Sequence, residues 1–490
     1  MAWRTVLGVL SYLLLILGLC LLAPLVVSII YDSQSPYETG EIVAFAVVSA
    51  FALVTGLSLR HKYSGFMSKK LGRREGFAIV SAAWLAAVIL GMLPYLFSGV
   101  TESLTDAFFE TMSGFTTTGA SIFGNPGNEI EKIPHGLQFW RCMTQWLGGM
   151  GIVVLSVALL SFLGVGGYRL VKAETPGGVA FERERPRMKD VASDMWKLYL
   201  GISVAEVVLL IISGTSVYDA FCHTFTTMST GGFSTHGESV AFFSPATQWI
   251  IIVFMFMAGV NFSLYAHLFR LNPRPMFQNP EFRTYAGIIL VVVVIGLLVV
   301  PFNSGLEQHI RDVVFQAISI GTTTGYATAD FDAWPQIMRL LLVLLMFVGG
   351  CMGSTGGGMK VARFIIYVKA IMRELHHLVF PHAIRPIRVG DKVIDPKIVA
   401  NIMAFGAVFA ALFVVGTLTM AACGYDLVTA SSASVAAIGN IGPGLGEVGP
   451  MTNWAHLPDL AKWIMSILML LGRLELFSVL ILFTSWAWKK

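Results

Sequence analysis

The sequence predicts an all-α integral membrane protein. Of its 490 residues, 55% are hydrophobic and only 13% are charged, whereas a soluble domain carries about 25% charged residues. Apolar runs such as 6–30 and 285–300 have the length, roughly 20 residues, that a helix needs to cross the hydrocarbon core. The first run is too long, and too soon followed by a second, for a cleaved signal peptide, so we expect it to be a retained span.

Ten apolar segments have the length and composition of spanning helices. Two come first and eight follow, which predicts a two-span N-terminal preamble and then four pairs of spans. The segments lie at about 5–30, 41–59, 76–98, 137–163, 195–214, 246–270, 284–302, 335–350, 398–422 and 460–487.

Basic residues gather in alternate loops, so the positive-inside rule predicts that these loops and both termini are cytoplasmic. The other loops are mildly acidic, with Lys132 and Arg311 as exceptions. The basic positions are Arg60, Lys62, Lys69, Lys70, Arg73, Arg74, Arg169, Lys172, Arg183, Arg185, Arg187, Lys189, Arg270, Arg274, Arg283, Arg373, Arg385, Arg388, Lys392, Lys397, Lys489 and Lys490.

Several function classes have no support in the sequence. The net charge of +4 is explained by sidedness, so we expect no nucleic-acid partner. The five cysteines form no CxxC pair, so they predict neither a metal site nor a disulfide framework. No HExxH or GxSxG motif and no paired intramembrane carboxylates occur, so we do not expect an enzyme.

Four segments on the extracytoplasmic side repeat one pattern. In each, an aspartate precedes a glycine, by 13 residues in three copies and by 16 in the fourth. Each segment lies between two spans, which predicts units at 71–170, 190–272, 280–375 and 393–490 after a preamble at 1–70. The aspartate–glycine pairs are Asp106 and Gly119, Asp219 and Gly232, Asp312 and Gly325, and Asp426 and Gly442.

Each repeated segment is typical of a re-entrant helix followed by a polar loop. Aspartate is a favoured N-cap, and about ten residues then follow, too few to span the membrane. Irregular backbone at membrane depth is tolerated where it is buried or lines water. We therefore expect the four loops to meet on one axis, with helix C-termini and backbone carbonyls directed at a monovalent cation.

The loops TTTGA (116–120), STGGF (229–233), TTTGY (322–326) and GNIGP (439–443) resemble the filter loops of the Trk/Ktr/HKT superfamily of potassium-channel-like transporters. The preamble and the stretches 349–360 and 439–450 resemble, more narrowly, the membrane subunits of bacterial Trk potassium-uptake systems. The resemblance implies four channel-like repeats around one pore in the bacterial inner membrane, a homodimer with one pore per protomer, and a nucleotide-binding cytosolic regulator of the TrkA type. It also implies potassium as the transported ion and no cofactor bound by this chain.

Carried over by position, the resemblance assigns a filter from all four loops. Plant relatives that favour sodium have serine at the first filter glycine, so Gly119 implies a preference for potassium. The fourth copy departs from the others by its Asn-Ile pair. The assigned residues are Thr117, Thr118, Gly119, Thr230, Gly231, Gly232, Thr323, Thr324, Gly325, Asn440, Ile441 and Gly442, with potassium at Thr118, Gly231, Thr324 and Ile441.

Six glycines within 349–358 predict a broken helix, because each costs about 1 kcal/mol in a helix relative to alanine. Close packing of helices through Gly349 and Gly353 is an alternative, while a phosphate-binding loop would require a following GK[ST]. The resemblance implies an intramembrane gate that blocks the pore. Its residues are Gly349, Gly350, Cys351, Gly353, Ser354, Thr355, Gly356, Gly357 and Gly358, with Arg473 as their partner.

Arg473 lies within an apolar segment, where a charge normally faces the bundle interior and has a partner. Glu475 is two residues away, and such residues do not face each other on a helix. We expect interfacial anchoring for Arg141 and Arg339 and snorkelling for Lys360. Glu110 and His223 are expected to support the filter or its packing, and the basic loops 176–190 and 376–392 to contact anionic lipid or the regulator.

The sequence thus favours gated potassium uptake. The alternative is a cation:proton or cation:sodium symporter with looser selectivity between potassium and sodium. A carrier with inverted repeats is disfavoured, because all four copies have one orientation.

Overall fold

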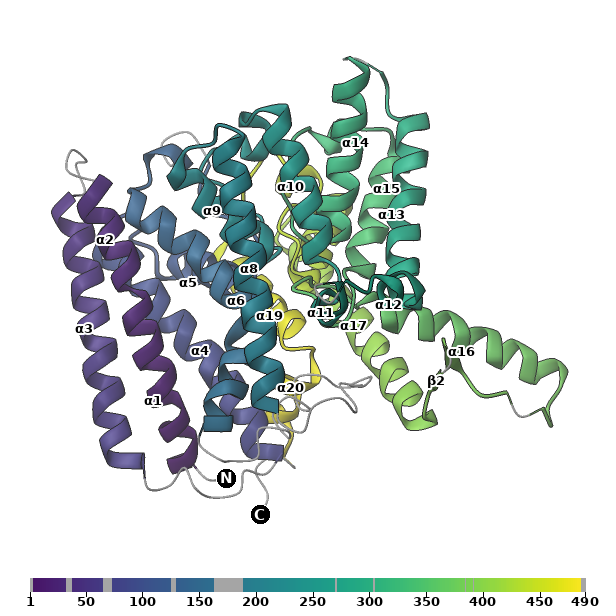
Figure 1. Cartoon of the computed structure of the whole chain (residues 1–490), viewed down its shortest axis with the longest axis horizontal. Coiled ribbons are helices and arrows are strands. Elements are labelled where there is room, and N and C mark those ends of the chain that lie inside the picture. The colour runs from purple at the N-terminus through teal and green to yellow at the C-terminus, as the bar shows by residue number, and fades with distance from the viewer. Residues whose placement is uncertain are drawn as a thin grey trace.

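The computed structural model describes residues 3–31, 38–64, 73–124, 129–162, 188–268, 271–302, 305–383, 385–390 and 392–485. Within these ranges the chain is helical, apart from one antiparallel ribbon of β1 (Arg388–Val389) and β2 (Lys392–Val393). The predicted all-α class is confirmed (Figure 1). The chain ends and most of the basic loops near 65–72 and 163–187 lie outside the described residues, so their predicted sidedness stays a prediction.

The preamble is a helical hairpin on one flank of the molecule (Figure 1). It consists of α1 (Trp3–Cys20), α2 (Leu22–Tyr31) and α3 (Glu38–Tyr63). The helices approach closely because small residues lie between them: the Ser49 hydroxyl donates to the carbonyl oxygen of Gly18 at 2.8 Å. Buried apolar residues continue from this hairpin into the first and fourth units, and another cluster joins the second and third.

Four units follow, each with a long helix, a short helix, a loop and a second helix. The first is α4 (Arg73–Phe97), α5 (Leu104–Phe115) and α6 (His135–Phe162). The second is α8 (Met188–Ile212), α9 (Val217–Met228), α10 (Pro245–Ala258) and α11 (Phe262–Leu268), after which α12 (Arg274–Gln278) leads on. The third is α13 (Pro280–Val299), α14 (Leu306–Gly321), α15 (Gln336–Val348) and α16 (Val361–Val379). The fourth is α17 (Pro396–Ala422), α18 (Leu427–Gly439), α19 (Asp459–Arg473) and α20 (Phe477–Leu480).

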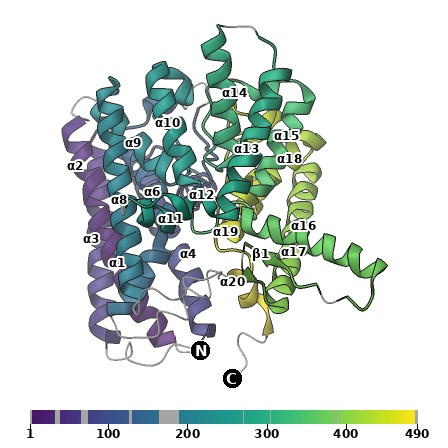
Figure 2. The ribbon, with the colours of Figure 1, turned by 45° about the vertical axis from the view of Figure 1, so that its right-hand side comes forward.

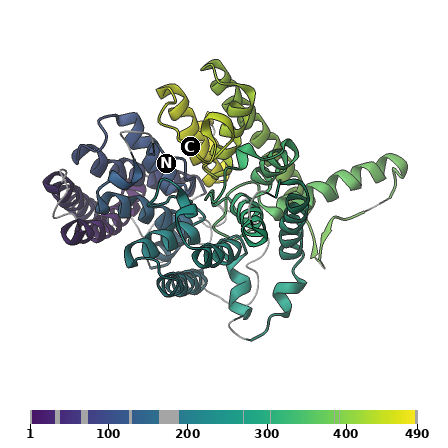
Figure 3. The same cartoon turned by 90° about the horizontal axis from the view of Figure 1, so that it is seen from above.

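The units form a closed ring. Seen from above, they follow one another round the molecule in chain order (Figure 3). The second helix of each unit contacts the short helix of the next: α6 contacts α9, α10 contacts α14, and α15 contacts α18. The contact of α19 with α5 closes the circle. Short 3₁₀ turns follow the loops at Ile130–Lys132, Ser239–Phe242, Phe331–Ala333 and Gly446–Val448, and a last one lies at Ile481–Phe483.

The described residues contain six candidate spans by length and composition, or seven if α19 and its continuation, bent by 108°, form one span. Several expected spans are interrupted: 137–163 at Gly151, 246–270 between α10 and α11, and 460–487 after Arg473. The segment from 335 ends at Val348, before the glycine-rich loop. A helix or helices cover each of the ten expected segments, but the number of crossings stays a prediction.

All four second helices are interrupted, whereas the sequence predicted a break only in the third unit. In α6 the break is at Gly151, with φ 65°, and α10, α15 and α19 end after 14, 13 and 15 residues. Near the breaks, the first and fourth units pack closely on short helices. A Cβ on Gly148 would lie 1.9 Å from the carbonyl oxygen of Phe115, and one on Gly472 would lie 2.0 Å from that of Ile438.

The predicted aspartate caps are wrong in three units. Only Asp426 is an N-cap, and hydrogen bonding to Thr429 together with the backbone N–H of Val428 lowers the pKa of its carboxyl group. Serines cap α5 and α9. In each, the serine hydroxyl oxygen accepts a hydrogen bond from the backbone N–H of the aspartate three residues later. Gly305 caps α14, and Asp312 lies inside that helix.

The changed caps explain the unequal spacing of the fourth copy. From the first helical residue to the filter glycine, the distance is the same in α5, α9 and α18, because Asp426 lies one position before its helix and Asp106 and Asp219 lie within theirs. With 16 residues, α14 is longer than the short helices of the other three units. The third unit, and not the fourth, therefore departs in length.

Candidate ion-conduction site

The four short helices end in the same backbone turn. Two positions in each turn have left-handed backbone. The first follows the C-cap residue of α5, α9 and α14 and is the C-cap residue itself in α18, and the second is the glycine two residues later. In each copy the N–H of the residue between them bonds back to the last turn of the helix, as from Thr118 to Ser113 O at 2.9 Å and from Ile441 to Ala436 O at 2.9 Å. The φ angles are 54° and 83° at Thr117 and Gly119, 56° and 78° at Thr230 and Gly232, 64° and 81° at Thr323 and Gly325, and 55° and 97° at Asn440 and Gly442.

These turns give non-glycine residues a conformation that they adopt at a cost of roughly 1–2 kcal/mol. The divergent fourth copy has the same turn as the others, with Asn440 at the position of the threonines. Such repeated left-handed backbone at a possible binding site indicates a local conformation that the surrounding structure imposes. It aims successive carbonyls in directions that a regular helix or strand does not allow.

The four turns meet in a closed ring. Each filter glycine lies against the carbonyl of the residue that precedes the glycine of the next unit, and the fourth lies against the first. A Cβ on Gly119, Gly232, Gly325 or Gly442 would lie 2.2, 2.0, 1.9 or 2.7 Å from the carbonyl oxygen of Gly231, Thr324, Ile441 or Thr118, respectively. The structure thus brings together all the residues that the sequence assigned to a filter, and no side chain fits between neighbouring turns at the glycines.

The ring is polar without ionised side chains. In the first and third turns, the hydroxyl pairs Thr116–Thr118 and Thr322–Thr324 have oxygen–oxygen distances of 2.8 Å. Among the described residues, no group of three or more His, Cys, Asp or Glu side chains could hold a metal ion. The negative potential here comes from carbonyls and from the C-terminal ends of four helices.

The glycine-rich loop lies directly beneath the ring. The N–H of Gly357 donates to the hydroxyl of Thr323 at 2.6 Å, and the N–H of Gly358 donates to Gly439 O at 2.9 Å. The Thr355 hydroxyl donates to Met228 O at 2.9 Å. The loop therefore bonds to the second, third and fourth turns at once.

Arg473 joins the loop to the first unit. Its Nη1 donates to Thr355 O at 2.7 Å, and its Nη2 donates to Gly148 O at 2.8 Å and to Gly149 O at 3.0 Å. Counted from the start of each second helix, Arg473 has the position of Gly149, Gly259 and Gly350. One arginine among three glycines has room to reach across the axis.

A family model described as TrkH, cation transport protein, matches residues 40–487. The chain belongs to the TrkH family. It is 37% identical over 501 aligned positions to the Trk system potassium uptake protein TrkH of Escherichia coli, and all of both chains is covered. It is 40% identical over 429 positions to the protein of that name in Salmonella typhimurium, with 86% of this chain and 87% of the other covered.

A solved structure agrees with this membership. The crystal structure of the potassium transporter TrkH from Vibrio parahaemolyticus superposes with a TM-score of 0.87 at 34% identity, and the match covers 100% of both chains. This TrkH-family chain therefore has the family fold.

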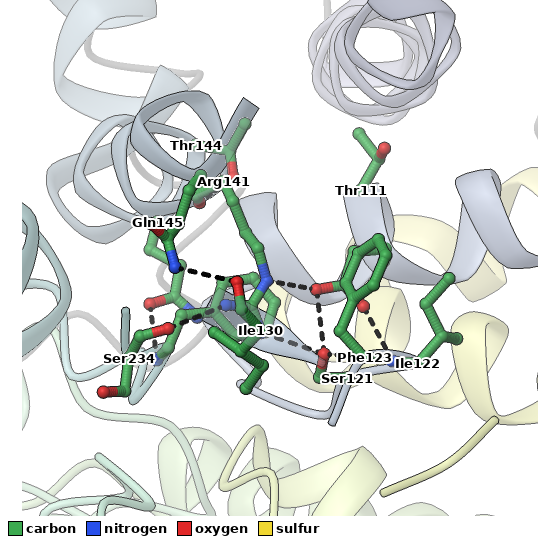
Figure 4. A network of polar contacts seen from close by, with 12 residues as sticks. Thr111, Ser121, Ile122, Phe123, Ile130, Arg141, Thr144, Gln145 and Ser234 are labelled. Carbon is green, nitrogen blue, oxygen red and sulfur yellow. Dashed lines mark hydrogen bonds and ion pairs between the residues drawn. The ribbon is translucent and has the colours of Figure 1, made fainter. Parts of the chain in front are cut away.

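The prediction that Arg141 is an interfacial anchor is wrong for this TrkH-family chain. The Arg141 side chain is only 1% exposed and pairs with the buried Glu110 at 2.5 Å. It also donates to Ser234 O at 3.0 Å and to the Ser121 hydroxyl at 2.9 Å, and Figure 4 shows these groups converging. Since Glu110 also accepts from the N–H of Ile122 at 2.9 Å, the pair ties the first loop to the second, as filter support for Glu110 would require.

Lys360 does not snorkel to an interface. Its side chain is buried, and its Nζ donates to the carbonyl of Gly356 in the loop beneath the ring. Glu475 pairs with Arg363 of α16 and not with Arg473. Arg339 is part-buried and pairs with Asp332 at 2.6 Å, and His223 bonds to the Ser234 hydroxyl at 3.1 Å.

Sequence reasoning about this TrkH-family chain missed two supports of the ring, Gln145 and Lys462. Lys462 of the fourth unit donates to Asp106 of the first at 2.6 Å, and it closes the seam between the ends of the repeat. A signal was available for Lys462 alone, since the fourth residue of every second helix is a long polar residue: Gln138, Gln248, Arg339 or Lys462.

Proposed function

We propose that this chain carries potassium ions across the bacterial inner membrane through one pore formed by its four loops. The observation that carries the proposal is the closed ring of the Thr118, Gly231, Thr324 and Ile441 carbonyls. Rings of backbone carbonyls replace the hydration shell of potassium in channels. The relatives named as potassium uptake proteins support the choice of ion.

The ring suits a monovalent cation by its charge. Four helix ends supply roughly half an elementary charge each when unscreened, and no carboxylate is needed at the ring itself. Divalent cations prefer carboxylate-rich sites, whereas neutral carbonyls bind weakly enough for an ion to leave again. The proposed filter consists of the assigned residues of all four turns.

We propose that the loop 349–358 is the gate. Its bonds to three turns and to Arg473 support a closed conformation in which backbone and a positive charge lie in the path of the ion. Opening then requires these bonds to break together. Glycines suit such a loop because their backbone adopts positive and negative φ angles at similarly low cost.

The proposed regulator is a cytosolic, nucleotide-binding subunit that acts on this gate, and the proposed assembly is a homodimer with one pore per protomer. Both termini are proposed to be cytoplasmic. Support comes from α16, which leads out of the gate and projects from the body (Figures 1 and 2). Its far end has exposed apolar side chains beside charged ones, which suits contact with a second copy or with lipid; they are Met372, Leu375, Leu378, Val379 and Phe380.

The test is cation flux through the purified protein in liposomes. We expect potassium and rubidium to enter faster than sodium, driven by the membrane potential alone, with protein-free liposomes as the control. Flux that requires an imposed proton or sodium gradient would replace the channel with the symporter. Absence of flux for every monovalent cation, also after removal of 351–356, would contradict the proposal.

A further inference from the structure

Gln145 of α6 occupies the place of a missing side chain in the second filter turn. Three turns have a side chain at the ring position, from Thr118, Thr324 and Ile441, but the second has Gly231. A Cβ on Gly231 would lie 2.3 Å from Oε1 of Gln145 and 2.8 Å from its Nε2. The amide therefore fills the volume that a threonine would take in this turn.

The same amide makes two hydrogen bonds to the turn. Its Nε2 donates to Gly231 O at 2.7 Å, and its Oε1 accepts from the N–H of Phe233 at 3.1 Å. Figure 4 shows Gln145 beside Arg141 on the same helix. A carbonyl oxygen has two lone pairs, so the bond from Gln145 leaves one for an ion on the axis.

The position of Gln145 is special within the fourfold pattern. It is the eleventh residue of its helix, and the eleventh residues of α10, α15 and α19 are the buried methionines Met255, Met346 and Met469. Met346 packs in one apolar cluster with Ile441 of the next turn. A ring position that has a side chain is thus paired with methionine at the eleventh position of the preceding unit's second helix. Gly231, which has none, is paired with Gln145.

We propose that Gln145 is a positioning residue that fixes the Gly231 carbonyl and thereby makes the second turn a full member of the ring. The inference rests on the proposed function, because the ring is taken as the ion-selective site. It predicts that Gln145 and Gly231 are exchangeable only as a pair. The double substitution Gln145→Met with Gly231→Thr would reproduce the residue pair of the third turn, which is Thr324 with Met255 at the eleventh position of the preceding unit's second helix.

The test is a double-mutant cycle with Gln145→Met, Gly231→Thr and the double variant, each measured for potassium over sodium flux and for thermal stability in detergent. We expect Gln145→Met to lower selectivity about tenfold, since it leaves the N–H of Phe233 and the Gly231 carbonyl without partners. Gly231→Thr should lower selectivity by a similar factor, because the added Cβ clashes with the side-chain amide of Gln145. The double variant should recover to within about twofold of the wild type.

Two further variants keep the cycle decisive. Gln248→Met removes another buried glutamine, which bonds to Val240 O and Phe243 O away from the ring, and it should leave selectivity unchanged. Gln145→Glu keeps the acceptor for Phe233 but removes the N–H donor, so it should lose selectivity with intact folding. Additive single effects, or wild-type selectivity in Gln145→Glu, would overturn the inference. If no cation passes even after removal of 351–356, the proposed function fails, while coupling in the thermal stabilities still decides whether Gln145 and Gly231 act as a pair.

Discussion

The guanidinium of Arg473 donates to the carbonyl oxygen of Thr355 at 2.7 Å, across 118 residues of sequence. The same side chain donates to Gly148 and Gly149 of the first unit. Because one group bonds to both sides of the axis, it fixes the glycine-rich loop under the ring and adds a positive charge there. The proposed gate and the arginine that holds it thus come from the third and fourth units.

Replacing Arg473 by alanine should raise cation flux at least about tenfold without any cytosolic partner, since each lost bond to a charged group is worth about 1.5–3 kcal/mol. Deletion of 351–356 should act in the same direction. Rubidium uptake into proteoliposomes measures both. The exposed Arg274 of α12 gives a matched control, Arg274→Ala, and unchanged uptake in both gate variants would contradict the role of the loop.

The hydroxyl of Thr323 should also hold the glycine-rich loop in its closed position, through the hydrogen bond that it accepts from the N–H of Gly357. Thr323→Val removes the acceptor and should raise flux severalfold, by less than Arg473→Ala, because about one neutral hydrogen bond of roughly 1 kcal/mol is lost. Thr323→Ser keeps the hydroxyl and should behave like the wild type. Equal flux in the valine and serine variants would show that the bond does not hold the loop.

Alanine at the four filter glycines should reduce selectivity in graded fashion. The clash of the added Cβ with the neighbouring carbonyl is severe at Gly325, Gly232 and Gly119 and mildest at Gly442, where the distance is 2.7 Å. All four also have left-handed φ, which costs alanine roughly 1–2 kcal/mol. The measurement is the ratio of potassium to sodium flux, and a larger loss at Gly442 than at Gly325 would argue against the ring geometry.

Breaking the Arg141–Glu110 pair should strongly destabilise the fold. Arg141→Met or Glu110→Gln leaves a buried group without its partner, at a cost of about 3–5 kcal/mol. Thermal unfolding in detergent, followed by loss of the monodisperse peak, measures the effect. Arg339→Met is the control, since its part-exposed pair with Asp332 should be worth about 1 kcal/mol or less; equal losses in both pairs would contradict this account.

The all-helical class and the four loops could be predicted because both signals are local. Apolar runs can be read directly along the chain. A unit that is repeated four times keeps similar residues at matching positions, such as TTTG in the first and third copies. The position of each filter glycine relative to its neighbours follows from such a repeat. The meeting of the four loops on one axis was also expected, because irregular backbone at membrane depth must be buried or line water. Which carbonyl meets which glycine did not follow, because each of these contacts joins residues of different units.

Other features needed the folded chain. Asp106, Asp219 and Asp312 look alike in sequence, yet none is a cap, because serines or glycine begin those helices and Asp106 pairs with Lys462 instead. Arg141 stands near a predicted span end, and only its packing against Glu110 shows that it is buried. A one-dimensional pattern cannot decide between surface and interior for a charge whose partner lies elsewhere.

The sequence by itself determined the membrane as the environment of this protein, the number of its repeats and the residues of its loops. It could do so because hydrophobicity and repetition are properties of the chain. Tertiary structure decided which carbonyl meets which glycine, that Arg473 bonds to Thr355 rather than to Glu475, and that Gln145 stands in for a side chain at Gly231. These are contacts between units, and they exist only when the fourth unit closes on the first.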